Sequence, residues 1–159
     1  MNKRTLLKAI LAALQTELAT FTRAAQAARA EATDPQSRAE NKYDTRGLEA
    51  SYLAAGQARQ VAELEAAIAA FRALPVRKFE AGESIALGAF VELERGRERT
   101  AYFLGPCAGG TEVTVAKRAV LVITPQSPLG SQLQGRKAGE QFELILGGQR
   151  QRARVVSVG

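Results

Sequence analysis

The first part of the chain carries hydrophobic residues at alternating steps of four and three. This stripe consists of Leu7, Leu11, Leu14, Leu18, Phe21, Ala25, Ala28 and Ala32. Such spacing keeps one face of a helix turned toward a partner helix. It predicts a first helix over about residues 3–32.

A second stretch repeats the same spacing before a proline. Its stripe consists of Ala54, Gln57, Val61, Leu64, Ile68 and Phe71, and Leu48, Tyr52 and Leu53 flank its beginning, where the stripe is weaker. Pro75 ends the pattern, because proline lacks a backbone donor and disfavours helical geometry in the residue before it. Neither helix can bury its stripe alone, so the two are expected to pair as an antiparallel coiled-coil hairpin.

The polar segment 33–44 separates the two stretches and is expected to form the hairpin tip. It carries three carboxylates: Asp34, Glu40 and Asp44. Because a long hairpin holds its tip far from the rest of a protein, these groups could be delivered into the active site of another protein.

Local turn chemistry offers another interpretation of the same residues. Ser37 and Glu40 have the spacing of a capping box at a helix start, and we place this reading ahead of metal binding. Asp34 before Pro35 is typical of a helix N-cap followed by a first-turn proline. A helix beginning at Pro35 would instead place Glu40 and Asp44 one turn apart on one face, where they could chelate an ion together.

Beyond residue 75 the pattern changes to short β-rich runs separated by glycines. The runs are 89–93, 100–104, 112–115, 141–146 and 153–158. Glycine turns such as Gly147-Gly148 favour an antiparallel sheet. Ser127 as N-cap, Pro128 and a closing Gly135 predict a short helix over 127–135. The predicted domains are a hairpin over 1–75 and a sheet domain over 76–159, an α+β architecture.

Composition excludes several classes of activity. The chain has 159 residues, a net charge of +6, no histidine and the single cysteine Cys107. A self-contained zinc enzyme and an internal disulfide are therefore excluded, and Cys107 is interpreted as inert. The pattern contains no export signal or membrane span, so we expect a cytoplasmic protein.

The basic excess favours polyanionic surroundings such as a nucleoprotein machine. The basic residues of the second half are dispersed over several strands, where some could face acidic partners and most are expected to aid solubility. They are Arg95, Arg97, Arg99, Lys117, Arg118, Arg136, Lys137, Arg150, Arg152 and Arg154.

Two motifs resemble those of the Gre family of bacterial transcription elongation and transcript cleavage factors (GreA/GreB-like). The segment 127–140 reads SPLGSQLQGRKAGE and follows the family pattern S-P-[hydrophobic]-x-x-x-L-[LI]-G-K-x-x-G-[DE] nearly throughout, although Gln134 departs from it. The segment 37–43 reads SRAENKY against the tip pattern D-x-x-E-N-A-x-Y, which brings Glu40 and Asn41 into register. Together with the order of the modules, the resemblance covers essentially the whole chain.

The resemblance implies an FKBP-like C-terminal domain that docks on the rim of the secondary channel of RNA polymerase. The docking residues it assigns are Gln126, Ser127 and Pro128. The hairpin would enter the channel, where Glu40, helped by Asp34 or Asp44, shares a Mg²⁺ with the polymerase. The chain itself would be no enzyme and hold no tight cofactor; it would act as a monomer, with at most indirect contact to nascent RNA.

The sequence also departs from the family pattern. The first acid of the tip pair falls on Ser37, Tyr43 lies one residue early, and Gln126 stands where some members have aspartate. These departures keep two alternatives open. One is a channel competitor that does not stimulate cleavage, in the manner of Rnk, and the other is a coiled-coil interaction module that no longer acts on polymerase.

Overall fold

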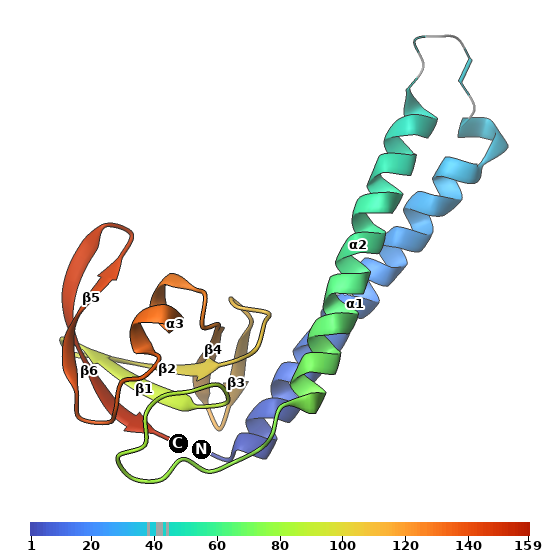
Figure 1. Ribbon diagram of the computed structural model, residues 1–159. Helices are drawn as coiled ribbons and strands as arrows, with labels where there is room; N and C mark the ends of the chain where they lie inside the picture. The colour runs from blue at the N-terminus through green and yellow to red at the C-terminus, as the bar shows by residue number, and fades with distance from the viewer. Residues whose placement is uncertain (38, 41–42, 44) are drawn as a thin grey trace. The chain divides into compact units, whose positions relative to one another are not determined.

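The computed structural model describes residues 1–37, 39–40, 43 and 45–159. They form two compact units: one joins Met1–Ala13 to Ala69–Gly159, and the other is Leu14–Ile68. Leu14–Ile68 is a helical hairpin, and the first unit, here called the sheet unit, combines the β-sheet with the base of both helices (Figure 1). The predicted α+β architecture is confirmed. The division into domains 1–75 and 76–159 stays a prediction.

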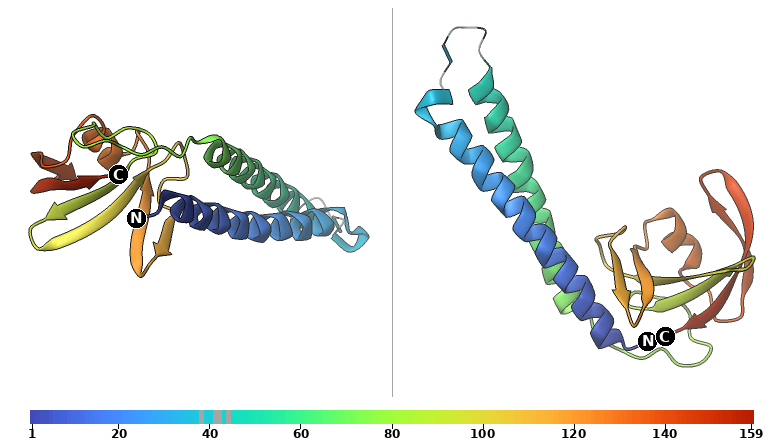
Figure 2. Two further views of the ribbon diagram at one scale, coloured as in Figure 1. Left: turned by 90° about the horizontal axis from the view of Figure 1, so that it is seen from below. Right: turned by 180° about the vertical axis from the view of Figure 1, so that it is seen from behind.

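Two long helices form the hairpin. Helix α1 spans Lys3–Thr33 and helix α2 spans Arg46–Ala73, which confirms the helix predicted over residues 3–32. Within Leu14–Ile68 the helices run antiparallel and side by side (Figure 2). Every residue of the two predicted stripes is buried or half-buried. The weaker beginning of α2 is also confirmed, because Leu48, Tyr52 and Leu53 are 56%, 72% and 53% exposed.

Local side chains and proline set the helix ends near the sheet. The Asn2 side chain caps α1, since its Oδ1 accepts hydrogen bonds from the backbone N–H groups of Arg4 (3.0 Å) and Thr5 (3.4 Å). These donors have no partner within the helix, so the cap supplies one. Helix α2 ends at Ala73, just ahead of Pro75, as predicted.

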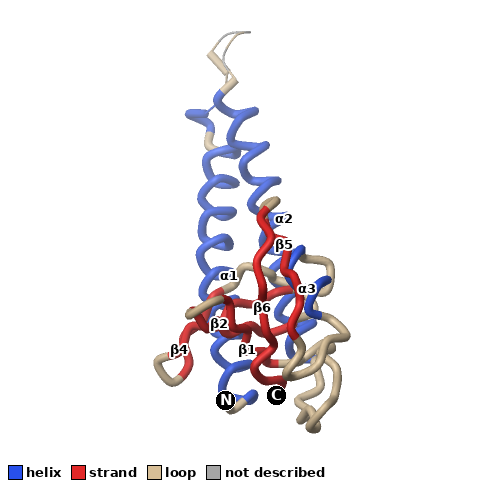
Figure 3. Tube along the Cα trace, turned by 90° about the vertical axis from the view of Figure 1, so that its left-hand side faces the viewer, coloured by secondary structure: helices blue, strands red, loops and turns tan. Residues whose placement is uncertain are grey.

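Six strands form a single sheet in the order β3-β4-β2-β1-β6-β5 (Figure 3). Their bounds are β1 Phe90–Arg95, β2 Glu98–Leu104, β3 Glu112–Val115, β4 Arg118–Ile123, β5 Gln141–Leu146 and β6 Gln149–Val158. Neighbouring strands are antiparallel as predicted, except that β2 and β4 pair in parallel. Five strands match the predicted runs, and β4 is absent from them. The predicted short helix is α3, Pro128–Leu133.

Alternation of side chains divides the sheet into two faces. One face carries the main core, which Leu129 and Leu133 of α3 join. On the opposite face, Phe103 of β2 packs against Phe71 from the end of α2, with ring centroids 6.4 Å apart. A Cβ on Gly105 would lie 2.8 Å from the Phe71 ring, so glycine permits this close approach. The end of α2 that belongs to the sheet unit therefore covers part of the opposite face.

In the described part of the chain, none of the helices combines the length and apolar character that crossing a membrane requires.

Candidate functional site

The Ser127–Glu140 motif begins at a tightly bonded loop, residues 124–128, here called the cap loop. Ser127 is the N-cap of α3: its Oγ accepts a hydrogen bond from Gly130 N (3.0 Å) and donates one to the carbonyl oxygen of Thr124 (2.7 Å). The Thr124 N–H also donates to Ser127 Oγ (3.3 Å). Pro128 occupies the first turn, where its fixed φ suits the helix. One hydroxyl thus joins the helix start to the end of β4.

Gly130 brings the first turn of α3 into direct contact with the cap loop. A Cβ at this position would lie 1.8 Å from the Thr124 carbonyl oxygen and 2.9 Å from Ser127 Oγ. No side chain can occupy that space without moving the backbone. The glycine in the motif is therefore required by packing.

Helix α3 is also fixed from its other side. The Gln132 side chain donates from Nε2 to the Ile145 carbonyl oxygen and accepts at Oε1 from the Ile145 N–H, both at 2.8 Å. Ile145 belongs to β5, one of the two edge strands of the sheet, so Gln132 hydrogen-bonds to this edge as another strand would. Sequence reasoning missed this role of Gln132, because the two residues are thirteen positions apart and no local pattern links them.

The three predicted docking residues are adjacent but differ in exposure. Gln126 and Pro128 are exposed, while Ser127 is half-buried and its hydroxyl is engaged within the loop. The cap loop can therefore offer Gln126 and Pro128 to a partner, and Ser127 acts by holding them in position. Their assignment to docking stays a prediction.

At the hairpin tip, Asp34 has the predicted turn role. Its Oδ1 accepts a hydrogen bond from the Gln36 N–H at 2.8 Å, and a 3₁₀ helix, η1, spans Pro35–Ser37. The Arg46 side chain reaches from the start of α2 to the Gln36 carbonyl oxygen (3.3 Å). Asp34 thus shapes the chain as it leaves α1.

Helix α2 does not begin at the predicted capping box of Ser37 and Glu40, because it begins at Arg46, beyond both residues. The Ser37 side chain itself lies outside the described part of the chain. The Thr45 hydroxyl instead donates to the Glu49 carboxylate at 3.0 Å across the first turn of α2. The helix starting at Pro35, which would have aligned Glu40 with Asp44, is wrong, since η1 ends at Ser37.

Among the remaining tip residues, the structure describes Glu40 and Tyr43. Glu40 and Tyr43 are exposed, Tyr43 at 79%. Asn41 and Asp44 lie outside the described residues. Asp34 already accepts a backbone hydrogen bond, and the described residues contain no group of three carboxylates or cysteines able to hold a metal ion. The assignment of Glu40 and Asp44 to a shared Mg²⁺ stays a prediction, because Asp44 lies outside the described residues.

Burial shifts the pKa of two side chains in the sheet unit. Lys3 Nζ and Arg77 Cζ both lie over the ring of Phe79, 4.2 Å and 3.8 Å from its centroid. Lys3 Nζ also donates a hydrogen bond to the Arg77 carbonyl oxygen at 2.7 Å. Burial, reinforced by the charge of Arg77, lowers the pKa of Lys3 to about 8. Burial also raises the pKa of the Cys107 thiol, which keeps it protonated and weakly nucleophilic at neutral pH.

Solved structures of Gre-type proteins share this arrangement of elements. The structure of GreA factor homolog 1 (Gfh1) of Thermus thermophilus matches at 25% identity and a TM-score of 0.40, over 96% of each chain. The chain is similar to Gre-type structures. Gfh1 of Thermus aquaticus matches at 25% identity and a TM-score of 0.41, over 95% of this chain and 94% of that one.

A shorter match covers a transcription elongation factor GreA/GreB from Nitrosomonas europaea. It has 21% identity and a TM-score of 0.36, over 60% of this chain and 78% of that chain. No protein-family model and no curated protein matches the sequence.

Proposed function

We propose that this protein is a Gre-like regulator of transcription elongation. It would bind RNA polymerase at the rim of the secondary channel and insert its hairpin tip, modulating pausing or the cleavage of backtracked RNA. The observation that carries the proposal is the cap loop, in which the Ser127–Glu140 motif begins with the helix start that its sequence implies. A motif becomes informative when it lies in the structural context that its chemistry requires.

The cap loop suits docking because it is rigid and exposed at once. Ser127 and Gly130 fix its backbone, and Gln126 and Pro128 remain open to a partner. A preorganised loop loses little conformational entropy on binding. An amide at Gln126 can donate and accept hydrogen bonds without the charge that aspartate would bring, so its polymerase contact would depend little on salt.

The hairpin offers a second contact surface at the beginning of α2. Leu48 and Tyr52 are four residues apart, lie on one helix face and are 56% and 72% exposed. Exposed apolar groups of this size favour contact with a protein surface. This observation supports insertion into a protein channel, and it equally supports the alternative that the hairpin is an interaction module for another protein.

The tip favours a regulator that binds without stimulating cleavage. Ser37 occupies the position where the family pair has its first acid, and the carboxylate of Asp34 is held in a local turn. Glu40 is the acid in register and would supply at most one ligand to a Mg²⁺ held by polymerase. The non-cleaving competitor is therefore the favoured form of the proposed function.

A cleavage assay on stalled elongation complexes with Mg²⁺ tests this proposal. We expect the wild-type protein to bind the complexes, to leave backtracked RNA uncut and to displace a cleavage-stimulating Gre factor. The variants Ser37→Asp and Glu40→Ala form a matched pair, one restoring the missing acid and one removing the remaining acid. Cleavage stimulated by the wild type and abolished by Glu40→Ala would assign the cleavage role instead, and failure to bind would reject both polymerase roles.

A further inference from the structure

Strand β6 carries a row of three arginines on one face. Arg150, Arg152 and Arg154 alternate along the strand, so their side chains project to the same side. All three are exposed. The intervening Ala153 is buried in the core, which identifies the arginine side as the face of the sheet turned away from α3.

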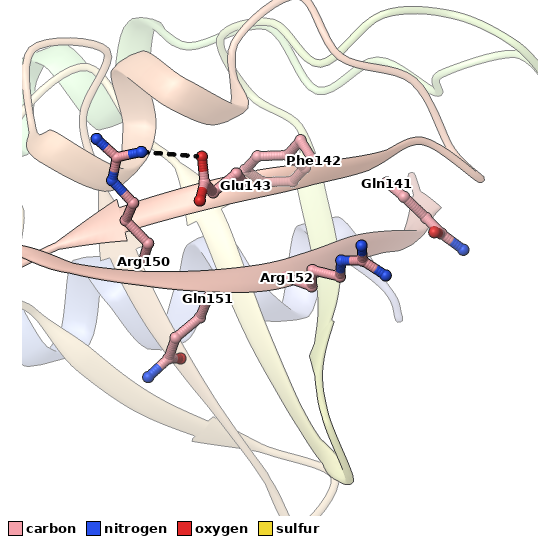
Figure 4. Close-up of a pocket in the computed structure, with 6 residues that line it drawn as sticks. All are labelled: Gln141, Phe142, Glu143, Arg150, Gln151 and Arg152. Atoms are coloured by element: carbon pink, nitrogen blue, oxygen red, sulfur yellow. Dashed lines mark ion pairs between the residues drawn. The ribbon is translucent and has the colours of Figure 1, made fainter.

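The acids that lie beside Arg152 and Arg154 are already paired with other arginines. Glu143 is in register with Arg152 but forms its ion pair with Arg150, at 3.7 Å (Figure 4). Glu94 is in register with Arg154 but pairs with Arg99, at 2.9 Å. Within the described part of the chain, neither Arg152 nor Arg154 forms an ion pair.

The surface around the row is open, and most of the side chains that line it are polar. A shallow concavity of about 430 Å³ lies on the hairpin formed by β5 and β6 and is lined by Gln141, Phe142, Glu143, Arg150, Gln151 and Arg152. The ring of Phe142 packs against the core, and the guanidinium of Arg136 stacks on it at 3.8 Å. The hairpin formed by β5 and β6 therefore presents cations and amides, and its aromatic ring, Phe142, is not free for a base to stack on.

We propose that the arginine row of β6 binds the backbone of a single-stranded nucleic acid. Alternate residues of an extended strand are about 7 Å apart, close to the separation of successive phosphates in an extended single strand. The guanidinium fork matches the phosphate oxygens and can form two hydrogen bonds to them. Because the row is one side chain wide, it follows one backbone rather than the two of a duplex.

The chemistry of the face favours a nucleic acid over an acidic protein. Protein interfaces bury an apolar and aromatic centre, whereas nucleic-acid interfaces are more polar and strongly positive. Here Ile145 is the exposed apolar residue of β5, at 46% exposure, and its neighbours Gln141, Glu143 and Arg150 are polar. Without a stacking platform, binding would be weak, salt-dependent and independent of base sequence.

Fluorescence anisotropy with the isolated 159-residue protein and labelled twelve-nucleotide uridine and thymidine oligomers tests this inference. Three phosphate contacts predict a roughly 20-fold loss of affinity between 50 and 200 mM salt. Arg152→Ala/Arg154→Ala should reduce that loss to roughly 3-fold and weaken binding at 50 mM salt at least tenfold. The two oligomers should bind with similar affinity, since the row contacts only phosphates.

Two controls distinguish the effect of the arginine row from the effects of net charge and of folding. Arg23→Ala/Arg59→Ala removes the same charge from exposed positions of the hairpin and should leave the salt dependence unchanged. Arg152→Lys/Arg154→Lys should retain most of the salt dependence. The inference would be overturned if Arg23→Ala/Arg59→Ala lost as much of the salt dependence as Arg152→Ala/Arg154→Ala. A tenfold preference for one oligomer, or tighter binding of a polyglutamate peptide, would also overturn it. Because no polymerase is present, the result is independent of the proposed function.

Discussion

The Thr124 carbonyl oxygen lies 1.8 Å from the point where a Cβ on Gly130 would be. This distance is far below van der Waals contact, so α3 and the cap loop can approach only because residue 130 has no side chain. The contact holds the start of α3 against the end of β4, and it fixes the backbone that carries Gln126 and Pro128.

Gly130→Ala is therefore expected to destabilise the sheet unit. Forcing a methyl group against backbone atoms should lower the free energy of unfolding by about 3 kcal/mol, at the upper end of overpacking effects. Urea denaturation followed by circular dichroism measures the change. Gly56→Ala is the matched control, because a Cβ on Gly56, within α2, would have no atom within 4 Å, and alanine there should stabilise by about 1 kcal/mol. Similar effects at both sites would contradict the packing argument.

A second prediction concerns the side chain of Gln132, which forms hydrogen bonds with the edge strand β5. Gln132→Ala removes both hydrogen bonds to Ile145 and should cost about 1–2 kcal/mol of stability. Hydrogen exchange should accelerate at the Ile145 amide more than at the amides of β1, at the centre of the sheet. Gln134→Ala, at an exposed position one residue beyond α3, should leave the exchange of Ile145 unchanged. Unaltered exchange in Gln132→Ala would show that the edge is protected by other means.

The pKa of Lys3 predicts a specific pH dependence. Burial lowers this pKa from 10.5 to about 8 in the folded protein. Between pH 8 and 10.5, Lys3 is therefore mostly protonated in the unfolded chain and mostly neutral in the folded protein. Stability contributed by Lys3 must then rise with pH across this range and be lost as pH falls through 8. Unfolding measured at several pH values should show wild type gaining stability relative to Lys3→Met over that window. Parallel curves for the two proteins would refute the shifted pKa.

The elements that the sequence predicts well are those set by local periodicity and local caps. The stripe from Leu7 to Ala32 located α1 within a residue, and the Ser127-Pro128 pair located the start of α3. Strand β4 escaped prediction because its hairpin turn is made by Ala116 and Lys117, both with positive φ (51° and 63°). Such turns normally contain asparagine or glycine, so the sequence carries no turn signal there.

Contacts between distant segments account for the remaining differences. Strand β2 pairs in parallel with β4, and Gln132 forms hydrogen bonds with Ile145. The residues that these contacts join are far apart in the sequence, so no periodic pattern predicts them. At the tip, two local signals compete for the start of the second helix. Ser37 has the spacing of a capping box with Glu40, and Thr45 donates a hydrogen bond to Glu49, where α2 begins at Arg46. Capping residues alone could not decide between these starts. The alternation of Arg150, Arg152 and Arg154 was visible in the sequence and needed the strand bounds to be interpreted.

The most direct test of the central claim is the affinity of purified core RNA polymerase for this protein. Biolayer interferometry should give saturable binding of the wild type and at least tenfold weaker binding of Gln126→Ala/Pro128→Ala. Gln151→Ala, a change at an exposed position of β6, should bind as the wild type does, and circular dichroism should show all three proteins equally folded. Absence of wild-type binding, or equal affinity of the cap-loop variant, would contradict the account.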